Sequence, residues 1–230
     1  MSHFQTKNTQ TEPANPTTTG RVYAGQTQDE RRQLRRQQFL EAGLEVFGTD
    51  GFRHATVRSI CRQAQLTDRY FYSEFGNLEG LLREVYNLCM DGIYQRLMLV
   101  FKDSSSRSDM AALVDEALLT FFSVMEDSRV ARVCMMELEG VSEETNAHYL
   151  GYIRRFALLL INLSRSVHPH WRITDEEGEM LGIALVGAMR QITTRWLQEN
   201  YATSRDSVVL SGKRIVMGLV LQLQSEFSPS

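Results

Sequence analysis

The sequence predicts an all-α protein in which a head of three short helices is followed by a body of six helices. Apolar residues recur at spacings of three and four over most of the chain, which is the period of a helix with one buried face. Residues that cap helix starts, such as Thr56, Thr67 and Thr174, stand directly before these stretches. Only 4 prolines occur in 230 residues, so few positions interrupt a helix.

Residues 28–76 form the predicted head, and its first helix covers residues 29–48. Arginines lie near the start of this helix, and its apolar residues share one face. The inward residues are Leu34, Phe39, Leu40, Leu44 and Phe47. Gly48 and Gly51 end the helix and lead into the turn that follows.

Two further short helices, joined by a tight turn at Gln65, cover residues 56–75. Thr56 caps one of them and Thr67 caps the other. Their inward residues are Val57, Ile60, Ala64, Phe71 and Phe75. A helix start offers free N–H groups to phosphate, and outward arginine and tyrosine side chains can reach base edges in a DNA major groove. The pattern therefore predicts a helix-turn-helix.

Residues 77–230 form the predicted body, and residues 1–27 are predicted to be a disordered tail because they are polar and lack apolar periodicity. The body helices are expected at residues 78–102, 110–125, 129–138, 145–167, 174–200 and 206–227. Thr174 and Glu177 have the spacing of a capping box. A serine-rich loop is expected at residues 104–106.

Charge is distributed unevenly along the chain. The net charge of −3 argues against a protein that coats nucleic acid over its whole surface. Residues 21–75 nevertheless carry nine arginines against seven acidic residues, whereas residues 76–230 carry fifteen basic and twenty acidic residues. Because arginine is the better bidentate ligand of phosphate and guanine, this imbalance favours a localised DNA-contacting face.

The remaining chemistry-bearing residues indicate neither an enzyme nor a metal site. Cys61, Cys89 and Cys134 are widely spaced in apolar patterns, so we expect reduced core thiols, with a redox role for Cys89 or Cys134 as the lesser alternative. His168 and His170 lack a nearby third ligand. No nucleotide-binding or catalytic motif occurs, so no cofactor, metal or catalytic residue is predicted.

Neither a membrane partner nor secretion is expected. The longest apolar run, residues 156–161, is too short to span a bilayer, and the N-terminus has no signal-peptide pattern. The expected location is the cytoplasm.

Three segments in a fixed order carry a family resemblance. LEVFGTDGFRHATV is followed by IxxxAxL and then by TxxYFYSEF with NLEGLL. Together they resemble the N-terminal signature of the TetR family of bacterial transcription regulators. The resemblance implies a homodimer that binds a palindromic double-stranded DNA operator, with a helical body that holds a small-molecule effector and the dimer interface.

Carried over by position, the resemblance assigns DNA contacts to the head. Thr56 and Tyr72 would contact phosphate, and Arg58 would reach phosphate or a base. The full set of predicted DNA-binding residues is Arg53, His54, Thr56, Arg58, Thr67, Asp68, Arg69, Tyr70 and Tyr72. Asp68 is equally explained as a partner of the helix dipole in the first turn.

This chain departs from the family pattern at four positions. Gln65 replaces the usual turn glycine, so the turn must tolerate a side chain if φ is positive there. Glu74 replaces a frequent histidine, while Gly76 and Leu78 replace common basic residues. We therefore expect DNA affinity to depend more on Arg35, Arg36, Arg53 and His54, or on the N-terminal tail. Of the four residues, Arg53 and His54 are the better candidates because they lie next to the second helix.

Apolar residues of the body are candidates to line an effector pocket, since methionine and aromatic side chains adapt to varied ligands. They are Met90, Tyr94, Met98, Phe121, Phe122, Met125, Met136, Tyr149, Tyr152 and Phe156. Ordinary core packing is the alternative for each of them. Glu137, Arg154 and Arg155 are the polar candidates. Small residues in 174–200 and apolar residues in 206–227 favour a four-helix dimer interface.

The functional prediction is a repressor that a small apolar or amphipathic ligand releases from its operator. An activator or a ligand-independent regulator of the same fold is the close alternative. An all-helical enzyme or adaptor is a remote one.

Overall fold

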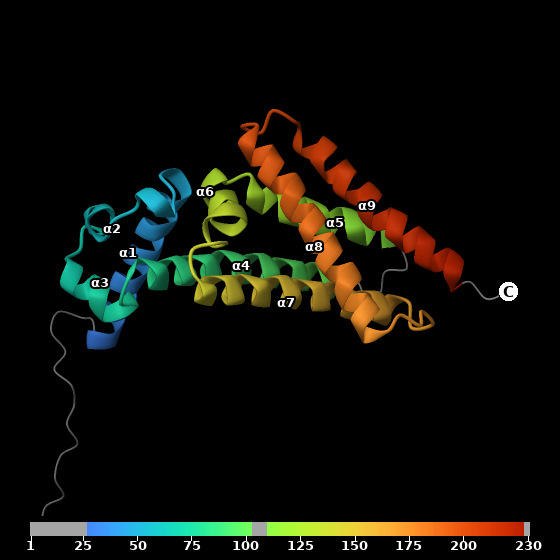
Figure 1. Cartoon of the computed structure of the whole chain (residues 1–230), viewed down its shortest axis with the longest axis horizontal. Helices are drawn as coiled ribbons and strands as arrows, with labels where there is room; N and C mark the ends of the chain where they lie inside the picture. Colours follow the sequence, from blue (N-terminus) through green and yellow to red (C-terminus); the bar gives the residue numbers. More distant parts are fainter. Residues whose placement is uncertain (1–26, 103–109, 228–230) are drawn as a thin grey trace, which may run out of the picture.

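The structure is a computed structural model that describes residues 27–102 and 110–227, and every regular element in these ranges is a helix (Figure 1). The prediction of an all-α fold is therefore confirmed. The α-helices are α1 (Gln28–Thr49), α2 (Val57–Ala64), α3 (Asp68–Phe75), α4 (Leu78–Lys102), α5 (Met110–Met125), α6 (Ser128–Arg132), α7 (Glu143–Val167), α8 (Asp175–Gln198) and α9 (Arg205–Glu226). The predicted tail, apart from Thr27, and the serine-rich loop lie outside the described residues.

The predicted helix at 129–138 is divided into two parts. The α-helical part is α6, and the chain then makes a π-helical turn, η3 (Val133–Glu137). Apolar periodicity does not distinguish one turn of π-helix from α-helix, so the sequence could not reveal this division. Such turns frequently occur at functional sites.

The caps explain where the head helices begin. Oγ1 of Thr56 accepts a hydrogen bond from the N–H of Ser59 at 3.0 Å, and Oγ of Ser59 accepts one from the N–H of Thr56 at 3.0 Å. This reciprocal pair is a capping box at the start of α2. Thr67 occupies the N-cap position of α3 as predicted, but its side chain makes no capping hydrogen bond.

The turn between α2 and α3 places Gln65 in the left-handed region, at φ 55° and ψ 36°. A residue with a Cβ is strained there, whereas glycine is not, although glycine loses more entropy on folding.

We expect Gln65→Gly to raise the free energy of unfolding by about 0.5 to 1 kcal/mol. Urea denaturation measures this change. The control is Gln63→Gly within α2, which should lower the same free energy by about 0.5 to 1 kcal/mol; equal losses in both variants would contradict the prediction.

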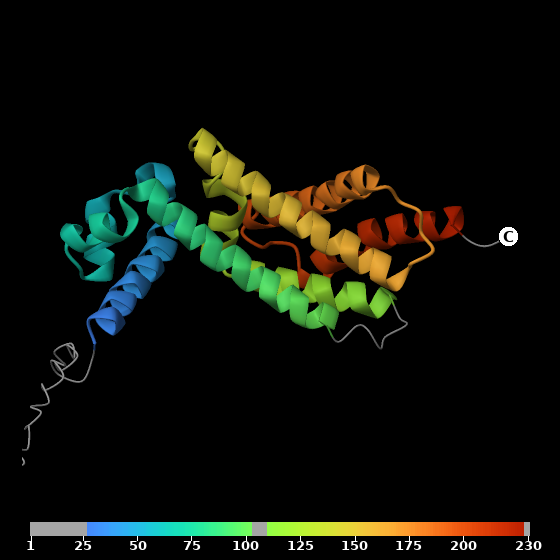
Figure 2. The same cartoon turned by 90° about the horizontal axis from the view of Figure 1, so that it is seen from below.

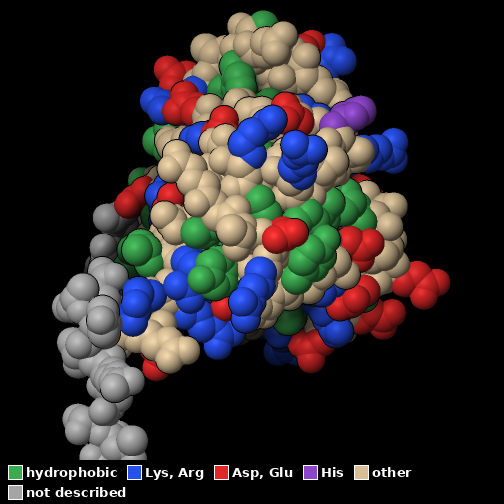
Figure 3. Space-filling view, turned by 90° about the vertical axis from the view of Figure 1, so that its left-hand side faces the viewer, with side chains coloured by type: hydrophobic (Ala, Val, Ile, Leu, Met, Phe, Trp, Pro, Cys, Tyr) green, Lys and Arg blue, Asp and Glu red, His purple; other side chains and the backbone are tan. Residues whose placement is uncertain are grey.

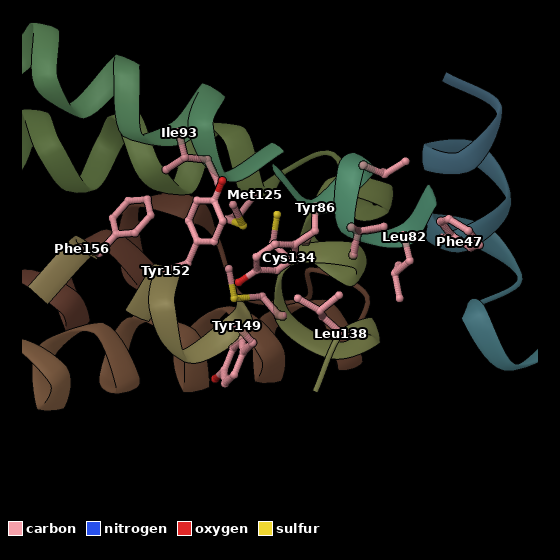
Figure 4. Packing of buried hydrophobic residues seen from close by; sticks show 14 of the residues in the cluster. Phe47, Leu82, Tyr86, Ile93, Met125, Cys134, Leu138, Tyr149, Tyr152 and Phe156 are labelled. Carbon is pink, nitrogen blue, oxygen red and sulfur yellow. The ribbon is translucent and has the colours of Figure 1, made fainter. Parts of the chain in front are cut away.

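One hydrophobic core runs from the head into the body. It includes Phe47 of α1, Leu82 of α4 and Tyr152 of α7 (Figure 4). A Cβ on Gly43 of α1 would lie 2.8 Å from Cγ2 of Val85 in α4, so these helices approach closely. The first turns of α4 therefore pack against the head, and the division of the chain at residue 76 stays a prediction.

The body is built around two long helices that lie side by side, α4 and α7 (Figures 1 and 2). Helix α8 packs on α7, α9 packs on α5, and α6 packs on α1 in the head. No helix in the described ranges is long and apolar enough to cross a membrane.

Candidate functional site

Helices α2 and α3 present a polar surface at the end of the head. Phe71 is fully buried, and its ring centroid lies 5.7 Å from the ring centroid of Phe39 in α1. This contact defines the side of α3 that faces the core. All nine predicted DNA-binding residues, from Arg53 to Tyr72, are exposed. Basic side chains are interleaved with hydrophobic ones on this end of the molecule (Figure 3). Each of the nine predicted side chains is thus accessible from outside the protein.

Four arginines of this surface form no ion pair within the described part of the chain. They are Arg53, Arg58, Arg62 and Arg69, and all are exposed. Most arginines of the body are paired instead, as Arg155 is with Asp91 and Arg165 is with Asp175. Unpaired guanidinium groups are available to phosphates and bases. Arg62 was not among the predicted residues.

Arg35 and Arg36 of α1 both make contacts within the protein. The Arg35 guanidinium lies 4.4 Å from the centroid of the Tyr70 ring, a cation–π contact that orients the tyrosine. Arg36 is paired with Glu84 of α4. Arg36 is therefore the less available of the two for phosphate.

Glu74 has a structural contact in this chain. Its side chain is 11% exposed, and it accepts a hydrogen bond from Nε of Arg32 at 2.7 Å. This pair ties the end of α3 to the start of α1. The Glu74 carboxylate therefore helps to hold α3 against α1.

A largely apolar cavity of about 210 Å³ lies within the body, between α4, α5, α7, α8, α9 and the π-helical turn. Its α4 wall extends from Tyr86 to Phe101, about 22 Å along the helix axis. The cavity is therefore elongated. Of the ten predicted pocket residues, four line it: Met90, Phe121, Tyr149 and Phe156.

The other six predicted pocket residues do not line this cavity. Phe122 and Met125 are fully buried in the core. The Tyr94 ring packs edge-on against Phe156, and the Tyr152 hydroxyl donates to Asp91 at 3.1 Å. Met98 and Met136 are 39% and 41% exposed. The spacing of apolar residues along each helix identified the buried face of α4 and of α7. It could not show which residues of that face line a cavity and which pack against a neighbouring helix.

Sequence reasoning missed several cavity residues that carry polar or sulfur atoms. They are Tyr86, Cys134, Met135, Arg165, Trp171 and Arg190. Tyr86 continues the apolar stripe of α4, a signal that could have identified it. The positions of Met135 and Cys134 depend on the π-helical turn, for which the sequence pattern gives no signal.

The thiols are free, as predicted. Cys89 and Cys134 share a hydrogen bond, which raises the pKa of the buried Cys134 thiol, and burial raises it further. In the described residues no group of three or more potential metal ligands is found.

The π-helical turn also contacts the head. The Glu137 carboxylate accepts hydrogen bonds from the N–H of Phe52 at 2.7 Å and from Nε of Arg132 at 2.7 Å. Nη1 of Arg132 in turn donates to the carbonyl of Thr49 at 2.9 Å, at the end of α1. These bonds join the body to the turn that precedes α2.

Gly51 is required at this junction. Its φ is +84°, and a Cβ there would lie 2.8 Å from Nη2 of Arg132 and 3.2 Å from Oε1 of Glu137. Both the backbone conformation and the close approach favour glycine. Met135 lines the cavity and Glu137 binds the head, so one turn of chain connects the two.

Comparisons with known proteins agree with this geometry. Residues 39–85 match the family described as bacterial regulatory proteins, tetR family. The chain is also 28% identical over 102 residues to the fatty acid metabolism regulator protein of Bacillus subtilis strain 168, a match that covers 44% of this chain. That match spans about half of the relative, 51% of its length.

Solved structures share the fold over most of the chain. The fatty acid degradation regulator FadR of Bacillus halodurans has a TM-score of 0.67 at 17% identity, covering 80% of this chain and 95% of that one. FadR of Bacillus subtilis in complex with stearoyl-CoA has a TM-score of 0.66 at 18% identity, covering 79% and 98%. A TetR-like transcriptional regulator from Rhodococcus sp. RHA1 has a TM-score of 0.58 at 19% identity, covering 81% and 96%.

Proposed function

We propose that this TetR-family chain is a transcriptional repressor that binds a palindromic operator as a homodimer and is released by an apolar or amphipathic ligand. One observation carries the DNA-binding part: the exposed arginines of α2, α3 and the preceding turn have no ion-pair partner within the described residues. The matched family consists of regulatory proteins, so an enzyme is not proposed. An activator would use the same contacts, since the sign depends on where the operator lies.

The DNA contacts fall into two proposed groups. Thr56 and Tyr72 have hydroxyls that donate to phosphate oxygens and position the head. Arg69 and Tyr70 lie in the first turn of α3, where side chains reach base edges in the major groove. Arg58 lies two residues after the N-cap Thr56 and reaches the neighbouring phosphate or base.

A gel shift tests this function directly. The full chain is mixed at low salt with DNA from upstream of its own gene and with palindromic sequences selected from random duplexes. A sequence-selective complex that weakens as salt rises is expected, because each phosphate contact releases counterions. Absence of any selective complex at low salt would reject the regulator.

The outer faces of α8 and α9 support the homodimer. Apolar residues stand in solvent there, including Met180 at 64% and Leu221 at 61% exposure. Gly187 and Gly218 also lie on these helices, and a Cβ on either meets nothing within 4 Å. Gly182, in contrast, approaches Ala157 within the body, so this small residue serves internal packing. An exposed apolar face with small residues allows a second copy to approach closely.

We expect Gly218→Arg to convert the dimer to a monomer, because a charged side chain would enter the proposed interface without a partner. Loss of the dimer should weaken operator binding by about 100-fold or more, since each subunit then binds one half-site alone. Analytical ultracentrifugation measures the mass. The matched control is Gly151→Arg on α7, another open glycine, which should remain dimeric. Dimers of unchanged stability in both variants would place the interface elsewhere.

The elongated cavity supports the ligand part of the proposal. The similar FadR of B. subtilis has been solved with stearoyl-CoA, so a long-chain acyl-CoA is the first ligand class to test. The cavity of about 210 Å³ is smaller than ordinary ligand pockets, which measure about 300 to 1,000 Å³. Such a ligand therefore has to expand the cavity by moving the body helices apart. Binding would then shift the protein toward the arrangement of the head that goes with this expanded body.

A further inference from the structure

The cavity has one charged residue at the end that faces the head. Arg190 of α8 lines it together with Tyr86 and Tyr149. Nη2 of Arg190 donates to the carbonyl of Met135 at 2.9 Å, and the same group is paired with Glu139. Nε of Arg190 is buried and has no acceptor among the described residues. A buried donor of a charged group without a partner is costly, so an acceptor is expected.

Two neighbouring phenols strengthen this interpretation. Tyr86 and Tyr149 line the same part of the cavity, and tyrosine hydroxyls are protonated at neutral pH and can donate hydrogen bonds. The guanidinium also lies 5.3 Å from the centroid of the Tyr149 ring, which holds it in place. A hydrogen-bond acceptor at this end of the cavity would therefore be close to several donors.

Glu139 determines which acceptor fits. Its carboxylate already neutralises the Arg190 guanidinium. A ligand carboxylate would bring a second negative charge to the same group, where like charges repel. A neutral carbonyl oxygen accepts the bond without that penalty.

We propose that Arg190 anchors the effector by donating a hydrogen bond from Nε to a neutral carbonyl oxygen, such as that of a thioester or ester, at the head-facing end of the cavity. This inference rests on the proposed function, since it assigns the polar end of the same ligand. The apolar tail of the effector then lies along α4 and points toward Trp171. Because Arg190 also donates to the Met135 carbonyl, the anchor is hydrogen-bonded to the π-helical turn that contacts the head.

The test compares two probes that differ only in the carbonyl. Stearoyl-CoA has it, and the thioether S-octadecyl-CoA has a methylene in its place. In the natural protein, calorimetry should show about 10- to 100-fold tighter binding of stearoyl-CoA, the range expected for a hydrogen bond to a charged group. Free stearate should bind more weakly than stearoyl-CoA.

Variants locate the donor. In Arg190→Met the two CoA probes should bind within about twofold of each other, whereas the control Arg165→Met should keep the full preference for the thioester. Trp171→Phe tests the opposite end, where the buried Nε1–H of Trp171 also lacks an acceptor among the described residues. Loss of the preference in Trp171→Phe, or its survival in Arg190→Met, would overturn the assignment.

The probes also separate this inference from the proposed function. Equal, tight binding of both CoA probes to the natural protein, with release of operator DNA, would reject the Arg190 anchor and leave the ligand-responsive regulator intact. This comparison needs no variant and so does not depend on whether Arg190→Met folds. If neither probe binds or releases DNA, the acyl ligand class itself is wrong, and the anchor falls with it.

Discussion

Arg69→Ala is expected to weaken operator binding by about 10- to 100-fold, because one bidentate contact to a base contributes about 1 to 3 kcal/mol of discrimination. Arg69 is exposed in the first turn of α3 and makes no ion pair within the described residues. We therefore expect Arg69→Ala to leave the stability of the fold unchanged. The preference for the operator over random DNA should fall with the affinity. Fluorescence anisotropy with operator and random duplexes measures both.

Two variants sharpen this prediction. Tyr72→Phe removes a proposed phosphate contact, so it should weaken all DNA sequences similarly. Arg172→Ala removes another exposed arginine, located far from the head between α7 and α8, and should change binding by less than about twofold. If Arg69→Ala weakened every sequence equally while Tyr72→Phe relaxed the base preference, the two assigned roles would be reversed.

Glu137→Ala is expected to lower the free energy of unfolding by about 2 to 3 kcal/mol, since it removes a charged acceptor from two donors. The donors are the N–H of Phe52 and Nε of Arg132, both at 2.7 Å. The larger consequence concerns communication between the body and the head. The ligand should bind with nearly unchanged Kd, yet it should shift the operator Kd far less than in the natural protein.

Denaturant titration gives the stability change, and ligand titrations of the protein–DNA complex give the coupling. Glu126→Ala is the matched control, because Glu126 forms an ion pair with Arg205 within the body. It should cost less than about 1 kcal/mol and leave the ligand response intact. A full ligand response in Glu137→Ala would show that the signal reaches the head by another route.

Much of the fold could be predicted from the sequence because the helices carry their own start signals. Thr56 and Thr174 precede clear apolar stripes, and the structure begins α2 and α8 directly after them. The bounds predicted for α4 and α5 agree with the structure. The positive φ considered for Gln65 is also present. These features depend on neighbours in the chain, which a sequence displays.

The cavity and the head–body junction were harder to predict, because they depend on residues that are distant in the chain. Arg190 meets Met135 only after α8 packs across the π-helical turn, and Glu137 meets Phe52 only when α6 packs on α1. Glu137 was considered as an inward polar residue, but its partner in the head has no sequence signal. Exposure of the α2–α3 surface was predictable, because Phe71 and Phe75 mark its opposite side.

The most direct test of the central claim is an anisotropy titration of the natural protein on a selected palindromic operator, with and without stearoyl-CoA. The account predicts a sequence-selective complex whose Kd rises by about 5- to 150-fold when the ligand is present, the usual range of coupling between two sites. A protein that binds operator and random DNA equally well, or whose operator Kd does not change with bound ligand, would contradict it.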